Sequence, residues 1–130
     1  MYAAIGAVSR WWDSAHTFSK DASNLSLDMR AGGCWCERLA DGGSVQHLVV
    51  VWAAPGKALR LKGALGPLQG MAVEGTLTFK IAAARDGSDV ELRYAAGGYA
   101  KDGLDKLAAP VDGVLGEQLV RLKTYAESSH

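Results

Sequence analysis

The sequence has no long apolar run and no excess of charge of either sign. A membrane-spanning helix needs about 20 consecutive apolar residues, and no stretch of this 130-residue chain approaches that length. Lysine plus arginine and aspartate plus glutamate number 14 each, so no charge imbalance would attract nucleic acid or an anionic membrane. The first residues, MYAAIGAVSRWW, lack the basic leader and long apolar core of a signal peptide. We therefore expect a cytoplasmic protein with no nucleic-acid partner and no membrane insertion.

Cysteine is scarce, and the common catalytic motifs are missing. Cys34 and Cys36 are separated by one residue; on a strand such a pair makes a poor disulfide, and it lacks the further ligands of a zinc site. There is no GxSxG, no HExxH and no glycine-rich phosphate loop. The sequence thus indicates a reducing compartment and no metal, nucleotide or flavin cofactor.

The clearest element present is an amphipathic helix over residues 110–126. Pro110 suits its first turn, where the missing N–H costs nothing. Gly113 and Gly116 each cost roughly 1 kcal/mol relative to alanine inside a helix, so we expect a strand or a ligand to approach closely there. Apolar side chains recur at steps of three and four along one face: Val111, Val114, Leu115, Leu119, Leu122 and Ala126.

Alternation of apolar and polar side chains predicts an antiparallel sheet before this helix. Residues 24–29 alternate first, with Leu25 and Leu27 on one face. Three tight turns follow, each joining two strands of a hairpin: residues 41–44 (DGGS), 54–57 (APGK) and 85–88 (RDGS).

The first two turns set a register that assigns the faces of three strands. Leu59 and Leu61 should face the core, because their strand alternates cleanly. The expected pairs are Glu37 with Leu48, Trp35 with Val50, Val50 with Leu61 and Trp52 with Leu59. Glu37, Trp35 and Trp52 are therefore expected on the buried face. The expected outer face holds Cys34, Cys36, Arg38, His47, Arg60 and Lys62.

The third turn gives the firmest structural expectation. It pairs Ile81 with Leu92 and Phe79 with Tyr94, and both strands then present their apolar side chains on the same face. A sheet with one apolar face must be covered, and the helix over residues 110–126 is the large apolar partner. We therefore predict one α+β domain over residues 1–130, with short helices near residues 2–8 and 9–13, a curved antiparallel sheet wrapped around the long C-terminal helix, and a cavity between them.

The pattern resembles the SRPBCC superfamily, the START-like or helix-grip fold, and within it bacterial homologues of the heat-shock-protein ATPase activator. The segments that carry the likeness are residues 10–12 (RWW), 21–25 (DASNL), 30–37 (RAGGCWCE), 63–69 (GALGPLQ) and 111–115 (VDGVL). Relative to this family the chain is truncated at its amino end, because the fold normally opens with a strand that pairs with residues 24–29 and 89–96. Two open sheet edges favour association, so we expect reduced stability or a homodimer.

Glu37 and two histidines are the candidates for chemistry. A buried, unpaired carboxylate would have a raised pKa, which suits a general acid or base; alternatively Glu37 reaches solvent or pairs with Arg38 or Arg10. His16 follows the double tryptophan, where such folds often have a pocket mouth, and is either a base or a solvated loop residue. His47 falls on the outer face.

Aromatic side chains provide a candidate ligand surface. Trp11 and Trp12 are adjacent, so on a helix only one can be fully buried, and the other would roof the cavity. The lining expected for a hydrophobic ligand is Trp12, His16, Trp35, Glu37, Trp52, Met71, Phe79, Tyr94, Leu115 and Gln118, although core packing would equally explain the aromatic members.

Three functions remain open at this point. The first is a binding protein for a small hydrophobic or aromatic molecule, with Glu37 or Gln118 orienting a polar group. The second is an enzyme resembling polyketide cyclases, with Glu37 and Tyr94, or His16, as acid and base. The third, implied by the resemblance alone, is an interaction protein similar to the heat-shock ATPase activator.

Overall fold

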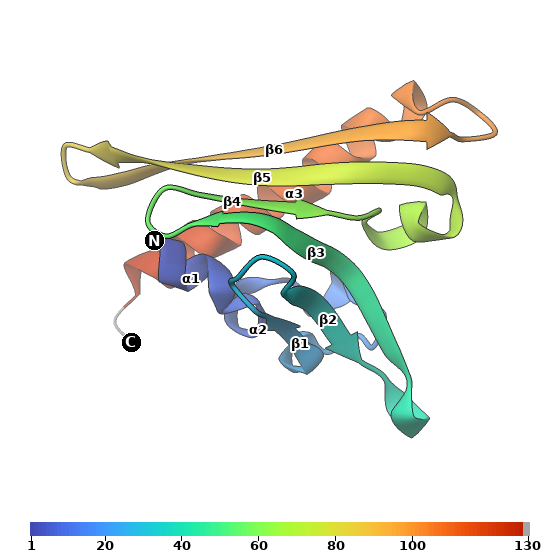
Figure 1. The fold of residues 1–130 in the computed structure, drawn as a ribbon, viewed down its shortest axis with the longest axis horizontal. Coiled ribbons are helices and arrows are strands. Elements are labelled where there is room, and N and C mark those ends of the chain that lie inside the picture. Colours follow the sequence, from blue (N-terminus) through green and yellow to red (C-terminus); the bar gives the residue numbers. More distant parts are fainter. Residues whose placement is uncertain (129–130) are drawn as a thin grey trace.

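The computed structural model describes residues 1–128 and confirms the α+β architecture. Six antiparallel strands form one curved, open sheet in chain order, and helix α3 lies across one face of it (Figure 1). The strands are β1 (Leu25–Leu27), β2 (Cys34–Arg38), β3 (Ser44–Ala54), β4 (Ala58–Lys62), β5 (Ala72–Ala84) and β6 (Gly87–Tyr99). The helices are α1 (Tyr2–Gly6), α2 (Val8–Trp11) and α3 (Asp105–Glu127), with 3₁₀ turns η1 (Ser14–His16), η2 (Ala22–Asn24), η3 (Ala40–Gly42) and η4 (Gly66–Gly70).

Helix α3 begins five residues before the expected start. Asp105 is its first residue, so Pro110 lies inside the helix and removes one backbone hydrogen bond. The carboxyl-terminal half packs against α1 and α2, and Arg121 Nε donates to the Trp11 carbonyl at 2.8 Å. The first ten residues of α3 contain no buried side chain, whereas Leu115, Gln118 and Leu122 are buried.

The expected register of the first hairpin is wrong, because Glu37 pairs with Val45 and Trp35 with Leu48, and a β-bulge lies between these two pairs. Cys36 pairs with Gln46, but the preceding Trp35 pairs with Leu48, which leaves His47 as an extra residue on β3. The prediction that His47 faces outward is therefore wrong, because a bulge re-aims the side chain that it carries. Trp35 and Glu37 are buried as expected, at 2 % and 1 % exposure.

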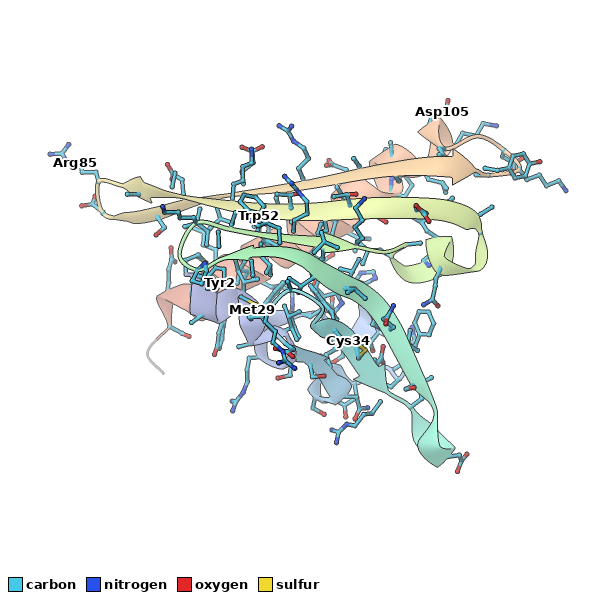
Figure 2. The ribbon with its side chains drawn as sticks, viewed as in Figure 1. Tyr2, Met29, Cys34, Trp52, Arg85 and Asp105 are labelled. Carbon is cyan, nitrogen blue, oxygen red and sulfur yellow. A yellow bond between two sulfur atoms is a disulfide. The ribbon has the colours of Figure 1, made fainter. Side chains whose placement is uncertain are left out.

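A second irregularity places Trp52 on the outer face. Val50 pairs with Leu61 as expected, but Trp52 pairs with Arg60, because the register shifts between Val50 and Trp52. Trp52 is 43 % exposed, and the Arg60 guanidinium lies 5.0 Å from its ring centroid. Its place on the sheet can be followed in Figure 2. The expectation that Trp52 lines the inner face is wrong.

The third hairpin keeps the expected faces with a shifted register. Phe79 pairs with Leu92 and Leu77 with Tyr94, a displacement of two residues from the expected pairs. A shift of two preserves the face of every side chain, since side chains alternate with period two. Phe79 is buried in the core, and Leu92 and Tyr94 pack against that core.

Three tryptophans contact one another in the hydrophobic core. Trp11, Trp12 and Trp35 meet edge to face, with ring centroids 5.1 to 6.3 Å apart. Trp11 is 2 % exposed and Trp12 9 % exposed, so the expectation that only one of them can be buried is wrong. Helix α2 ends at Trp11 and Trp12 has an extended backbone, so the angular spacing of a helix does not apply to this pair.

Cys34 and Cys36 form a disulfide in the structure, which corrects the expectation from their spacing. Their Cα atoms are 5.4 Å apart, within the range that disulfides require and shorter than the roughly 6.6 Å of two extended strand steps. The pair lies where the register of β2 and β3 shifts. It therefore no longer supports the expectation of a reducing compartment.

Strands β1 and β6 are the two edges of the sheet within the described residues. Association of two copies through such edges stays a prediction. Within residues 1–128, no helix combines the length and the apolar character that crossing a membrane requires.

Candidate functional site

A pocket of about 540 Å³ lies between the inner face of the sheet and the amino-terminal half of α3. Three further segments complete its wall: the residues after α2, the β3 bulge and the loop before η4. Most of the lining is apolar, as is typical of small-molecule sites. The apolar side chains are Trp12, Ala15, Phe18, Leu25, Trp35, Leu65, Pro67, Leu68, Leu107, Pro110, Val111, Val114 and Leu115; the polar ones are His16, Thr17, Lys20 and His47.

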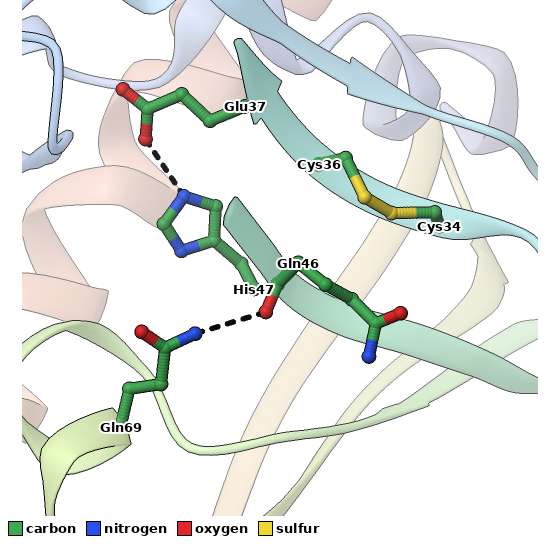
Figure 3. Close-up of a disulfide and its surroundings, with 6 residues drawn as sticks. All are labelled: Cys34, Cys36, Glu37, Gln46, His47 and Gln69. Carbon is green, nitrogen blue, oxygen red and sulfur yellow. Dashed lines mark hydrogen bonds and ion pairs between the residues drawn. A yellow bond between two sulfur atoms is a disulfide. The ribbon is translucent and has the colours of Figure 1, made fainter. Parts of the chain in front are cut away.

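Glu37 lies behind this wall and fixes the loop that follows η1. Its side chain is fully buried, and its oxygens accept the backbone N–H groups of Phe18, at 3.1 Å, and Ser19, at 2.6 Å. A third hydrogen bond joins Oε1 to His47 Nε2 at 2.8 Å (Figure 3). Burial alone would raise the pKa of Glu37, but the hydrogen bonds from Ser19, His47 and Phe18 outweigh it and hold the pKa below its usual value.

The ionised Glu37 determines which nitrogen of His47 carries the proton. A carboxylate can only accept hydrogen bonds, so Nε2 is the protonated nitrogen and Nδ1 of the neutral ring is an acceptor. The His47 side chain is 10 % exposed, and Nδ1 has no hydrogen-bond partner within the described part of the chain. Phe18 meets the ring edge to face, with centroids 5.2 Å apart.

Tyr94 fixes another wall of the pocket. Its hydroxyl donates to the Gly63 carbonyl at 2.9 Å and accepts the Leu65 N–H at 3.2 Å. Gly75 leaves the space that this ring occupies, because a Cβ there would overlap the Tyr94 hydroxyl. Burial raises the pKa of Tyr94, although the hydrogen bond from Leu65 opposes the rise.

A second pocket of about 580 Å³ adjoins the first beneath the same half of α3. Tyr94, Leu92 and Gly116 belong to its wall. The side chains common to both pockets are Leu68, Leu107, Val111 and Leu115. The amino-terminal half of α3 therefore covers unfilled volume on both of its flanks.

The structure places some of the expected lining residues around the first pocket and the others elsewhere. Trp12, His16, Trp35 and Leu115 line it, and Glu37 supports it from behind. Tyr94 lines the second pocket. The expected residues that line neither pocket are Trp52, Met71, Phe79 and Gln118.

Phe79, Met71 and Gln118 lie in the core, at the surface and between two segments, respectively. Phe79 is a core residue, 1 % exposed, and Met71 is 40 % exposed. Gln118 is buried and its Oε1 accepts the Asp13 N–H at 2.9 Å. Its Nε2 has no partner within residues 1–128. Gln118 therefore links α3 to the segment after α2.

Glu37 and Tyr94 do not form the acid–base pair that the sequence suggested. The hydrogen bonds of Tyr94 go to residues 63 and 65, and those of Glu37 go to residues 18, 19 and 47. The side-chain partner of Glu37 is instead His47, which the sequence placed on the outer face. Phe18 and Lys20 were also missed, because they lie in a polar stretch without periodicity.

A small polar cluster lies beside the pocket mouth. Ligand atoms of Asp13, His16 and Glu117 lie within 4.8 Å of one another, a spacing that a divalent cation could bridge. The pKa of Asp13 is lowered by the Ala15 N–H and, with burial opposing, by the positive charge of Arg121. His16 and Glu117 are exposed, and we assign no metal to this cluster.

Comparison with known proteins finds the same fold in other proteins but gives no function. No family model matches the chain, and no curated protein matches it significantly. The fold is similar to that of an uncharacterised protein from Rhizobium leguminosarum, with a TM-score of 0.57 and 19% identity over 97% of this chain and 86% of that one. A crystal structure of a Mesorhizobium loti protein has a TM-score of 0.55 and 15% identity over 79% and 74% of the two chains. These similarities show the fold alone.

Proposed function

We propose that the protein binds a small, largely apolar molecule in the 540 Å³ pocket between the sheet and α3. The observation that carries the proposal is the pocket itself, with Trp12, Trp35 and Phe18 among its walls. Its volume falls within the roughly 300–1,000 Å³ of small-molecule sites. The architecture is also compatible with the helix-grip fold that the sequence resembles, in which a sheet grips a long helix.

Rigid support for the pocket comes from two buried polar anchors. Glu37 holds the loop that carries Phe18, and Tyr94 holds the loop that carries Leu65. Anchored walls reduce the ordering cost of binding. The packing that these anchors maintain leaves the pocket open, which supports a role in ligand binding over a purely structural one.

The test compares two substitutions on the same helix. Val114 lines the pocket, whereas Val120 is 64 % exposed and lines neither of the two pockets beneath α3. Val114→Trp should fill the pocket and reduce binding of the fluorescent apolar probe anilinonaphthalene sulfonate at least tenfold. Val120→Trp should leave the dissociation constant of the probe unchanged.

Native mass spectrometry of the wild-type protein gives an independent readout, since a co-purified molecule would appear as added mass that Val114→Trp loses. Equal probe binding by both variants would overturn the proposal.

A further inference from the structure

We propose that His47, oriented by Glu37, is the base of this pocket and takes a proton from an ionisable hydroxyl group on a bound aromatic ligand, such as a phenol or an enol. This inference rests on the proposed function, because it needs a ligand in the pocket. It assigns both the class of ligand and the residue that acts on it.

The first support is the geometry of the histidine. The bulge directs His47 into the pocket wall, and the 2.8 Å hydrogen bond to the buried Glu37 carboxylate fixes the ring. Glu37 is itself held by two backbone N–H groups. A histidine oriented in this way presents Nδ1 as an acceptor and gains a positive charge next to a negative one.

The second support is the charge of the wall. Titratable side chains among the lining residues are His16, Lys20 and His47, all of which carry or can gain positive charge. Behind the wall, Glu37 contacts His47, and Asp13 and Glu117 lie beside His16. Among residues 1–128, the segment of α3 that faces the pocket and the loop before η4 contribute no ionisable group, and no carboxylate lines the wall directly. Such a wall favours an anion that forms on the ligand.

The third support is the shape of the apolar part. Trp12 and Trp35 meet edge to face at 5.1 Å, and Phe18 packs against the His47 ring. All four rings belong to one pocket. Aromatic walls favour an aromatic ligand, whose ring can stack on them or meet them edge to face.

The step is a simple proton transfer. The O–H bond of the ligand breaks and an N–H bond forms at His47 Nδ1, which leaves an imidazolium held by Glu37 and an oxyanion on the ligand. Nothing is oxidised or reduced, and no co-reactant is needed.

The experiment uses para-nitrophenol, whose phenolate is visible by absorbance. In the presence of saturating wild-type protein, the probe should ionise about one pH unit lower than in buffer, the size of shift that a neighbouring opposite charge produces. His47→Gln retains a donor to Glu37 but removes the base, so the shift should disappear while the probe still binds. Gln46→Ala, at the exposed preceding position on β3, should retain the shift.

A second measurement needs no ligand. Nitrogen NMR of the imidazole should show the Nε2–H tautomer of neutral His47 in the wild-type protein, and Glu37→Leu, which removes the acceptor of this N–H, should weaken that preference. An equal probe shift in wild type and His47→Gln, or the opposite tautomer, would overturn the assignment of the base.

The two probes distinguish a failure of this inference from a failure of the proposed function. If anilinonaphthalene sulfonate binds but para-nitrophenol does not, the pocket stands and the ligand class is wrong. If neither probe binds, the proposed function fails as well.

Discussion

The two halves of α3 rest on very different surroundings. The carboxyl-terminal half buries Leu122 and Gln118 against α1, α2 and the tryptophan cluster. The amino-terminal half, residues 105–114, buries no side chain and lies over two pockets. One continuous helix thus serves as a core element at one end and as the cover of a cavity at the other.

The difference indicates how this fold leaves pockets under one part of a helix whose other part is packed in the core. The sheet is curved, so a straight helix of about 35 Å can pack closely against it over only part of its length. Packing at the carboxyl-terminal end is secured by hydrogen bonds from Arg121 and to Gln118. Core packing and the pockets therefore belong to different turns of the same helix.

The sharpest test of the comparison replaces the same residue type in each half. Leu122 is 1 % exposed, so Leu122→Ala should lower the free energy of unfolding by about 2–5 kcal/mol, through lost burial and a new cavity. Leu107 is only partly buried and lines both pockets. Leu107→Ala should therefore cost less than about 1 kcal/mol.

Urea denaturation of both variants measures the difference. Similar losses for Leu122→Ala and Leu107→Ala would mean that the amino-terminal half of α3 is packed as firmly as the other.

The second test concerns the loop after η1, which Glu37 holds against the first pocket. Glu37→Gln removes charge-assisted hydrogen bonds from a buried site and should cost about 2 kcal/mol at neutral pH. Because the folded-state pKa of Glu37 is lowered, the unfolded chain takes up the proton first as the pH falls. The stabilisation is therefore present above the unfolded-state pKa of about 4.3 and is lost as the pH falls through the folded-state value.

The measurement is the free energy of unfolding of both proteins between neutral and acidic pH. Asp13 and Asp21 also have lowered pKa values, but both proteins retain them, so the difference between the two curves reports Glu37 together with its hydrogen-bond partner His47. A difference that stays constant with pH would contradict the assigned ionisation.

Much of the fold could be predicted from the sequence because its signals are periodic. Alternation predicted the strands, and the turn at residues 85–88 predicted a hairpin whose faces survive a register error of two residues. The stripe over residues 110–126 predicted the long helix, although its start at Asp105 was missed because Pro110 resembles a helix beginning.

The site could be predicted only in part, because it depends on departures from regularity. Trp35 and Glu37 were placed correctly by alternation, but one extra residue in β3 moved His47 inward. The second shift moved Trp52 outward. The expected pairs already fail beside the turns, where Arg38 pairs with Ser44 and Ala54 with Ala58. A bulge adds a further change of face, and it has no signature in the alternation on either side of it.

The smallest expected effect tests whether the space beside Gly113 and Gly116 of α3 is empty. The sequence suggested that Gly113 and Gly116 permit close approach, but a Cβ at either position would meet no other atom within 4 Å. Gly113→Ala should therefore raise the free energy of unfolding by about 1 kcal/mol, through helix propensity alone. Thermal and urea denaturation measure this gain.

Gly116 provides the comparison within the same turn of helix. It lines the second pocket, whereas Gly113 lines neither. Gly116→Ala should give a similar gain in the empty protein, and should weaken binding only of a ligand that extends into the second pocket. A loss of stability on Gly113→Ala would show that another surface packs against α3 at this position. The amino-terminal half of α3 would then be part of an interface.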